Sequence, residues 1–175
     1  MRLQVVLAGV GGQGVLFASR LIYELAQRRG EAVIGSETHG MSQRGGSVVS
    51  HLKIGNFYGP LIGKGRADLL LALQREEGLR SLPMLKEGGE AVINAPSLPS
   101  IEGVKVYPVD AGAIASGEGN PKGVNLVIVG YALGKGFLPY TLEEAKAVIA
   151  SLSPPYLLEA NLRALKGGFS QGCSD

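Results

Sequence analysis

Short apolar runs alternate with amphipathic stretches along this chain. The first run, residues 3–8, is rich in Val and Leu and has the length of a strand that is buried on both faces. In residues 13–29 the apolar positions recur at helical spacing, and Gly30 follows where a helix commonly ends in the left-handed conformation. A buried strand that leads directly into a helix predicts a parallel sheet with crossover helices.

The middle of the chain repeats this alternation. Residues 47–54 alternate between two sets of side chains, which predicts a strand whose faces differ. Other apolar runs are bounded by Gly, Pro and Asn residues, which favour turns. We predict further strands at residues 31–36, 68–73, 90–94 and 104–109, and a short helix at residues 76–86.

The last third of the sequence is predicted to be helical. Residues 124–133 are apolar almost all round, so this helix should be buried in the core or against another chain, and Asn125 is a candidate to open it. Residues 141–144 form a capping box that begins the next helix. The prolines at 154–155 suit the first turn of a final helix, which the glycines at 167–168 are expected to end before a polar tail.

The composition favours a single domain. The chain has 175 residues, 45% of them hydrophobic, which is enough for one compact core and leaves little room for a second. We therefore expect one domain over residues 1–175. Its predicted architecture is an α/β, Rossmann-like three-layer fold with a mostly parallel sheet and a helical C-terminal third.

Charge and hydropathy exclude several classes of protein. The 17 Lys and Arg residues nearly balance the 15 Asp and Glu residues and form no basic run, so nucleic acid is not an expected partner. No apolar stretch reaches the roughly 20 residues that span a bilayer, and the N-terminus lacks a signal-peptide pattern. We expect a cytoplasmic protein without a membrane partner. The single cysteine, Cys173, excludes an internal disulfide and a cysteine metal cage.

A glycine motif follows the first predicted strand. The segment Gly9-Val10-Gly11-Gly12-Gln13-Gly14 has the G-x-G-x-x-G spacing of dinucleotide-binding turns. Glycines let the backbone approach a phosphate, and the amides that open the following helix point toward it. We predict that Gly9, Gly11, Gly12, Gln13 and Gly14 contribute to cofactor binding. The alternative is that the glycines only permit a tight turn with close packing.

A polar loop follows the second predicted strand, in residues 37–46. Arg44 offers a bidentate donor for phosphate or carboxylate beside two adaptable glycines. Glu37 stands where an acid would bind the ribose of a nicotinamide or flavin cofactor. If both polar segments follow neighbouring parallel strands, they face one ligand-binding crevice. The candidate binding residues in this loop are Glu37, His39, Ser42, Gln43, Arg44, Gly45 and Gly46.

His51 lies in a predicted strand and is expected to be a hydrogen-bonded sheet residue rather than a catalyst. The chain has two histidines, and their placement, with no carboxylate partner in view, is poor evidence for a metal. We therefore expect no metal site.

Both polar segments resemble those of a known family. Residues 6–15 and 37–51 are similar to the gamma subunit or domain of the 2-oxoacid:ferredoxin oxidoreductases, and the likeness continues through residues 67–73 and 161–169. The sequence around His39-Gly40-Met41 is most similar to that of the smaller, beta subunit of indolepyruvate:ferredoxin oxidoreductase. The resemblance covers nearly the whole chain.

The resemblance implies coenzyme A-dependent oxidative decarboxylation of a 2-oxoacid by a complex that carries thiamine diphosphate, magnesium and iron–sulfur clusters. This chain has no Gly-Asp-Gly thiamine motif, and one cysteine cannot hold a cluster, so we expect these cofactors on a partner subunit. Ferredoxin would be reached only indirectly, and this chain alone should be inactive. Its expected role is to position coenzyme A or substrate, with His39 and Arg44 as candidates.

Two alternatives remain open at this point. The glycine motif and Glu37 also fit a stand-alone oxidoreductase that binds NAD or FAD, although no catalytic acid or base is evident. A purely structural subunit would instead depend on the apolar surface of residues 124–133 and not on the Arg44 loop.

Overall fold

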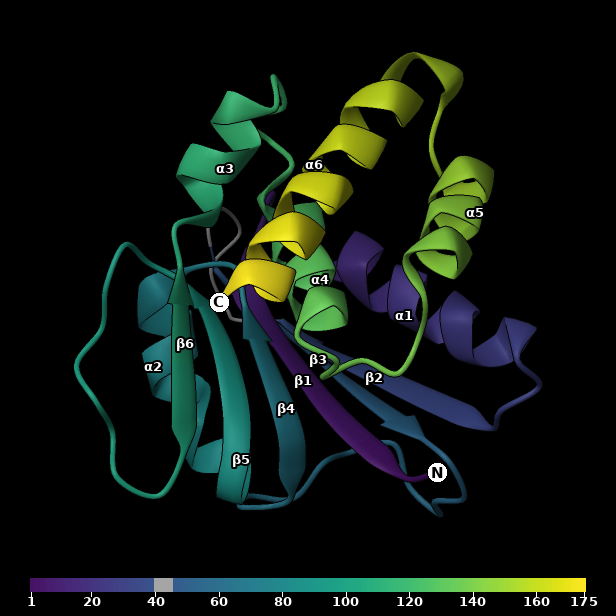
Figure 1. Cartoon of the computed structure of the whole chain (residues 1–175). Helices are drawn as coiled ribbons and strands as arrows, with labels where there is room; N and C mark the ends of the chain where they lie inside the picture. The colour runs from purple at the N-terminus through teal and green to yellow at the C-terminus, as the bar shows by residue number, and fades with distance from the viewer. Residues whose placement is uncertain (40–45) are drawn as a thin grey trace.

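Six strands form a mixed sheet in the computed structural model, which describes residues 1–39 and 46–175 (Figure 1). The strands are β1 (Leu3–Val10), β2 (Val33–His39), β3 (Ser47–Ile54), β4 (Ala67–Ala72), β5 (Leu85–Asn94) and β6 (Lys105–Val109). They lie in the order β2-β3-β1-β4-β5-β6. The neighbouring pairs β1–β4, β4–β5 and β5–β6 are parallel, whereas β3 is antiparallel to both β1 and β2. The predicted mostly parallel sheet is confirmed.

The two polar segments do not follow neighbouring strands, which was the condition set for a shared crevice. Strand β2 points in the same direction as β1 but is not its neighbour, because β3 lies between them. Along the β1–β3 pair, Leu3 lies opposite Ile54 at one end and Val10 lies opposite Ser47 at the other. The two polar segments therefore follow strands that share an edge of the sheet but are separated by one strand. The alternating side chains of β3 are typical of an antiparallel strand.

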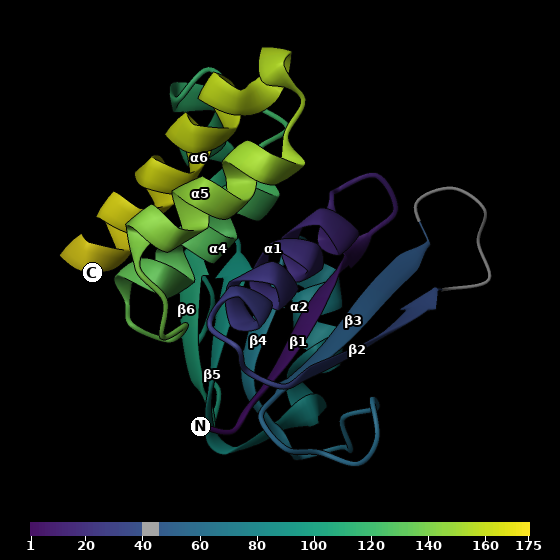
Figure 2. The same cartoon turned by 90° about the vertical axis from the view of Figure 1, so that its right-hand side faces the viewer.

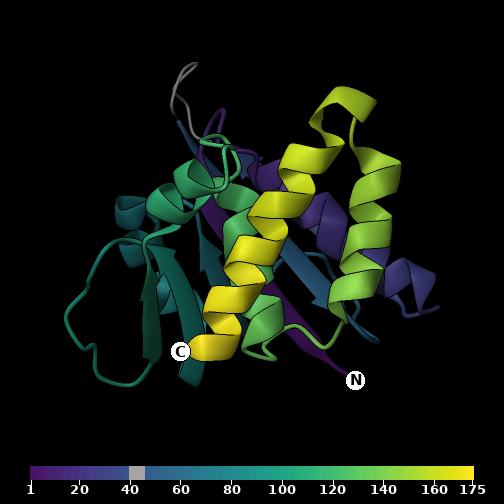
Figure 3. The same ribbon diagram turned by 45° about the horizontal axis from the view of Figure 1, so that its top comes forward.

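Six helices flank the sheet in the described part of the chain: α1 (Val15–Arg28), α2 (Arg75–Ser81), α3 (Ala111–Gly117), α4 (Val124–Gly134), α5 (Leu142–Leu152) and α6 (Pro155–Ser174). Helices α1 and α4 cover one face of the sheet, and α2 covers the other (Figures 1 and 2). Helices α3, α5 and α6 pack outside α4 and α1 (Figure 3). The predicted three layers are present, with further helices added on one side.

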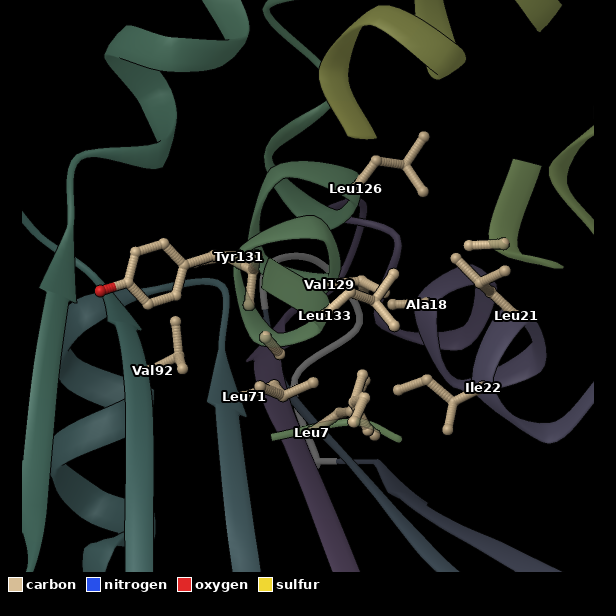
Figure 4. Close-up of a cluster of buried hydrophobic side chains, with 14 of the residues drawn as sticks. Leu7, Ala18, Leu21, Ile22, Leu71, Val92, Leu126, Val129, Tyr131 and Leu133 are labelled. Atoms are coloured by element: carbon tan, nitrogen blue, oxygen red, sulfur yellow. The ribbon is translucent and has the colours of Figure 1, made fainter. Parts of the chain in front are cut away.

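The main hydrophobic core lies between the sheet and the pair α1 and α4. Leu7 and Leu71 of the sheet face Ile22 of α1, and Val129 and Leu133 of α4 point into the same space (Figure 4). These side chains are almost completely removed from water. A smaller core on the opposite face packs beneath α2. Burial of apolar area on both faces explains the uninterrupted apolar runs at residues 5–10 of β1 and 69–72 of β4.

Helix α4 is buried all round because α6 packs directly over it (Figure 3). The contact is built from glycines on both helices, Gly130 and Gly134 on α4 and Gly168 and Gly172 on α6. A Cβ atom on any of these four would collide with the backbone of the other helix. The expected helix end at residues 167–168 was therefore wrong. Gly167 and Gly168 lie inside α6 and permit close packing against its neighbours, and α6 continues to Ser174.

Other elements agree with the sequence to within a few residues. The capping box of α5 is formed, because the Thr141 hydroxyl accepts a hydrogen bond from Glu144 N while the Glu144 carboxylate accepts one from Thr141 N. Helix α2 ends earlier than predicted, since Pro83 lies in the short 3-10 turn Leu82–Met84 that leads into β5. Helix α3 was not predicted. Its seven residues include two glycines and give only a weak helical signal.

None of the helices that the structure describes is both long enough and apolar enough to cross a lipid bilayer.

Candidate functional site

The glycine turn lies at the carboxyl edge of the sheet, between the end of β1 at Val10 and the start of α1 at Val15. Gly11 and Gly12 are exposed there. Gly12 has a φ of +90°, and a Cβ atom built on it would meet nothing within 4 Å. The positive φ explains why this position is a glycine, and the open space in front of it leaves room for a ligand.

The other glycines of the motif serve packing. A Cβ atom on Gly9 would come within 2.8 Å of Val15 Cγ2 and 3.3 Å of Leu73 Cβ. Gly14 has a φ of +81°, and a Cβ atom there would collide with the side-chain amide of Asn125. The structure therefore divides these glycines into two groups: Gly11 and Gly12 face solvent, whereas Gly9 and Gly14 allow α1 to pack against the end of β4 and against α4.

The side chain of Gln13 braces the turn from within. Its Oε1 atom accepts a hydrogen bond from Val10 N at 2.9 Å, and its Nε2 atom donates to the carbonyl oxygen of Leu73 at 3.2 Å. The same carbonyl accepts a second hydrogen bond from Asn94 Nδ2 at 3.0 Å, and Asn94 Oδ1 accepts one from Ala111 N. Gln13 thus ties the ends of β1 and β4 together, and Asn94 extends the link to β5 and α3.

The N-terminus of α1 is electrostatically suited to an anion. Gly14 occupies the N-cap position, no side chain caps the helix, and its first turn contains no acidic residue. The first-turn amides of any helix lack acceptors within that helix, and the aligned peptide dipoles add positive potential at that end. An anion bound at this position would accept hydrogen bonds from these amides and would be attracted by the positive potential.

Asn125 was missed as a site residue by sequence reasoning. It is buried in the first turn of α4, where Nδ2 donates to the carbonyl oxygen of Gly14 at 3.1 Å and Oδ1 accepts from Leu126 N at 3.0 Å. Gly123, not Asn125, is the N-cap of α4. The start of α4 is thereby fixed beside the start of α1. No local pattern marks this role, because the partner lies 111 positions away.

The second polar segment reaches the glycine turn. Gly11 N donates a hydrogen bond to the carbonyl oxygen of Gly46 at 2.9 Å, so the end of the loop is held against the turn. Two predicted site residues, Gly11 and Gly46, are therefore brought together although β3 separates β1 from β2. The predicted residues Ser42, Gln43, Arg44 and Gly45 lie outside the described residues, as does the side chain of His39.

Glu37 does not occupy the place of a ribose-binding acid. It lies within β2 opposite Ser50 of β3, so a whole strand separates it from β1 and the glycine turn. In dinucleotide-binding domains the acid follows the strand next to the glycine turn. Glu37 instead lines an open cleft of about 770 Å³ between α1 and β2, together with Arg20 and Tyr23. This geometry argues against the NAD or FAD alternative.

His51 is a sheet residue, as predicted. Its Nδ1 atom accepts a hydrogen bond from Ile62 N at 2.9 Å, and the side chain is buried. Burial lowers the pKa of His51 below its ordinary value, and the neighbouring Lys53 ammonium lowers it further. In residues 1–39 and 46–175, no three His, Cys, Asp or Glu side chains converge in a way that could hold a metal ion.

The sequence of this chain is similar to those of a known protein family and of several of its members. Residues 4–171 match the family model for pyruvate ferredoxin/flavodoxin oxidoreductase. The indolepyruvate oxidoreductase subunit IorB of Archaeoglobus fulgidus is 36% identical over 99% of this chain and 97% of its own length. The subunit of the same name from Thermococcus kodakarensis is 34% identical over 94% of this chain and 93% of its own length.

Solved structures share the fold. The gamma subunit of keto/oxoacid ferredoxin oxidoreductase from Geobacter sulfurreducens superposes with a TM-score of 0.82 at 25% identity, covering 99% of both chains. The 2-oxoglutarate:ferredoxin oxidoreductase of Magnetococcus marinus, solved with 2-oxoglutarate, coenzyme A and succinyl-CoA bound, gives a TM-score of 0.83 at 21% identity. That match covers 99% of this chain and 31% of the larger chain.

Proposed function

The chain belongs to the pyruvate ferredoxin/flavodoxin oxidoreductase family, as its sequence resemblance predicted, and we propose that it is the gamma-type subunit of a complex that oxidises indolepyruvate or a related 2-oxoacid. The observation that carries this proposal is the similarity to indolepyruvate oxidoreductase subunits, which extends over almost the whole of both chains.

In the proposed reaction the 2-oxoacid loses carbon dioxide and its acyl group passes to the sulfur of coenzyme A. The two electrons released reduce ferredoxin, and the thiol proton is released to solvent. Thiamine diphosphate with magnesium would supply the electron sink for decarboxylation, and iron–sulfur clusters would carry the electrons. This chain does not fit a cluster, because its one cysteine, Cys173, is exposed at the end of α6. We assign these cofactors to a partner subunit.

The contribution of this chain is to bind and orient. The exposed Gly12, with the uncapped start of α1, forms a site for a phosphate of coenzyme A or the carboxylate of the 2-oxoacid, while the Gly11 amide is engaged by Gly46 and fixes the turn. Gln13 and Asn125 hold that site rigid through their hydrogen bonds to Leu73 and Gly14. Rigid placement of a reactant lowers the entropic cost of reaching the transition state. Arg44 is proposed as the guanidinium that completes the site.

Co-purification with native partners tests this proposal. The complex would be assayed for reduction of ferredoxin or a viologen dye with indolepyruvate, pyruvate and 2-oxoglutarate, each with and without coenzyme A. We expect activity in the complex only, and the 2-oxoacid with the highest kcat/KM identifies the substrate. A chain that purifies without a partner and binds a nicotinamide or flavin cofactor would contradict the proposal.

The purely structural role is separated from the binding role by one substitution. If this chain only supports its partner, Arg44→Ala leaves the KM for coenzyme A and the KM for the 2-oxoacid unchanged in the assembled complex. If it positions a reactant, one of the two KM values rises while assembly is retained. The burial of α4 within this chain already removes its apolar surface from the set of candidate docking faces.

A further inference from the structure

A second distinctive surface lies at the opposite end of the strands from the glycine turn. Figures 1 and 2 place the N-terminus and the loop that follows β3 at this end. The basic aromatic surface, as we name it, consists of Arg2, Lys53, Phe57, Tyr58 and Arg66. The Arg2 guanidinium lies 4.2 Å from the centre of the Phe57 ring, and the Lys53 ammonium lies 5.3 Å from it. Phe57 is thus in cation–π contact with both side chains.

The surface is grooved on both sides of Arg2. One groove, of about 750 Å³, is lined by Arg2, Phe57 and Tyr58. The other, of about 430 Å³, is lined by Arg2, Phe57 and Arg66. Because Arg2 and Phe57 line both grooves, they form a ridge between two depressions. Such relief fits protruding side chains of a protein partner better than it fits a flat surface.

The charge of this surface is positive and largely unpaired. Lys86, in the second groove, pairs with Asp68 at 2.5 Å. Within the described residues Arg2, Lys53 and Arg66 make no ion pair. The whole chain carries a formal net charge of only +2, so these cations are concentrated rather than typical of the chain. A partner with carboxylates at this position gains electrostatic complementarity.

Large apolar side chains are exposed on the two segments that carry this surface, the N-terminus and the loop between β3 and β4. Tyr58 is fully exposed, and Met1 and Leu61 are also largely open to water. These are three of the six large apolar side chains that are exposed in the described residues. The backbone of Met1 is held in place against Gly55, where a Cβ atom would collide with the Met1 carbonyl oxygen. Arginine and aromatic residues together are characteristic of the centres of protein interfaces.

We propose that the basic aromatic surface docks an acidic segment of the partner subunit, one that carries apolar side chains between its carboxylates. This inference rests on the proposed function, which supplies the partner. A symmetric contact with a second copy of this chain is disfavoured, since it would set Arg2, Lys53 and Arg66 against the same three cations. An anionic membrane is disfavoured because the ridge of Arg2 and Phe57 between two grooves fits a flat bilayer surface poorly.

The test measures binding of the purified chain to its native partner subunit by surface plasmon resonance at 50 and 300 mM NaCl. The double variant R2E/R66E is compared with K105E/K166E, which makes the same change in net charge at two exposed lysines that line neither groove. We expect R2E/R66E to raise the Kd at least tenfold at low salt and less at high salt. The control should change the Kd less than twofold. Equal effects of the two variants, or no effect of either, would overturn the proposal.

Tyr58→Ser gives a second readout that does not depend on charge. Because the Tyr58 side chain is fully exposed, its removal should leave the Tm unchanged while raising the Kd several-fold at both salt concentrations. An unchanged Kd would count against this surface. The free chain is also tested for binding to vesicles of phosphatidylserine and phosphatidylcholine. If it binds them and R2E/R66E does not, the surface binds a membrane and the proposed protein partner is wrong. If wild-type chain has no partner at all, the proposed function fails. If the complex forms and is active but R2E/R66E binds normally, only this inference fails.

Discussion

Asn125 donates a hydrogen bond from Nδ2 to the carbonyl oxygen of Gly14 at 3.1 Å, which joins the first turn of α4 to the N-cap of α1. The contact leaves no room for a Cβ atom at Gly14. It therefore gives a packing reason for one glycine of the motif. It also means that the position of the glycine turn depends on α4, a helix that lies more than a hundred residues further along the chain.

Asn125→Ala is expected to destabilise the protein. The substitution removes two hydrogen bonds from a buried side chain, so the free energy of unfolding should fall by about 1–3 kcal/mol. Urea unfolding followed by circular dichroism measures the change. Asn56→Ala, at an exposed asparagine, serves as the control and should stay within about 0.5 kcal/mol of wild type. Equal stability of the two variants would show that the Asn125 contact does not hold the turn.

The local parts of this fold could be predicted from the sequence. The apolar run of β1, the glycine turn and the amphipathic α1 are each defined by neighbouring residues, and so is the capping box at Thr141. The family resemblance rested on the same local segments. The sequence could not show which glycines of the turn are exposed, Gly11 and Gly12, and which are packed, Gly9 and Gly14. All four are the same residue, and their surroundings include distant residues.

What could not be predicted depends on pairing over long distances. The insertion of β3 between β1 and β2 is set by hydrogen bonds between strands, and the alternation within β3 does not name its partners. The end of α6 was misjudged for the same reason. A glycine pair in a helix indicates either termination or close packing, and only the presence of α4 decides between them.

Gly168→Ala should be strongly destabilising. The new methyl group would collide with the carbonyl group of Val127, which is backbone within α4 and cannot rotate away. Overpacking of this kind typically costs about 1–3 kcal/mol, so the Tm should fall by several degrees. Gly112→Ala is the matched control, because a Cβ atom there meets nothing within 4 Å and the helix gains propensity. A Tm for Gly168→Ala equal to that of Gly112→Ala would contradict the close helix contact.

The Arg29–Glu144 ion pair should make stability depend on acidic pH. Hydrogen bonds from the Arg29 guanidinium at 2.6 and 2.7 Å, and then from Thr141 N, lower the pKa of Glu144 to about 2. The carboxylate is therefore held ionised in the folded state more strongly than in the unfolded chain. Its stabilisation is complete above about pH 4.5 and is lost as the pH falls toward 2.

Glu144→Gln tests this dependence because glutamine keeps the capping geometry but removes the charge. The Tm of the variant should lie below wild type at pH 7, and the two values should converge as the pH approaches 2. Glu143→Gln, at the exposed partner of Lys146, should differ little from wild type at either pH. A constant difference between Glu144→Gln and wild type across this range would exclude the ion pair as its source.

His51 should weaken the fold when it is protonated. Its Nδ1 atom accepts the Ile62 N–H, and a proton on Nδ1 would set two donors against each other. Because the folded pKa is lowered from the ordinary 6.5, the unfolded chain binds the proton first, and stability falls as the pH drops below about 6.5. NMR titration of the imidazole, assigned with His51→Gln, should give a midpoint below 6.5. A midpoint at or above that value would refute the assignment of Nδ1 as an acceptor.

Gly12→Ala should impair reactant binding by more than its effect on stability explains. Gly12 requires a positive φ, which costs an alanine about 1–2 kcal/mol, and it faces the open space proposed for a phosphate or carboxylate. Gly103 is a matched control with a φ of +85° and equally open surroundings, in the loop that precedes β6. Both variants should lose similar stability, but only Gly12→Ala should raise the KM for coenzyme A or the 2-oxoacid in the assembled complex. If the two variants lowered activity equally, strain alone would account for the loss, and the glycine turn would be a structural connection without a ligand.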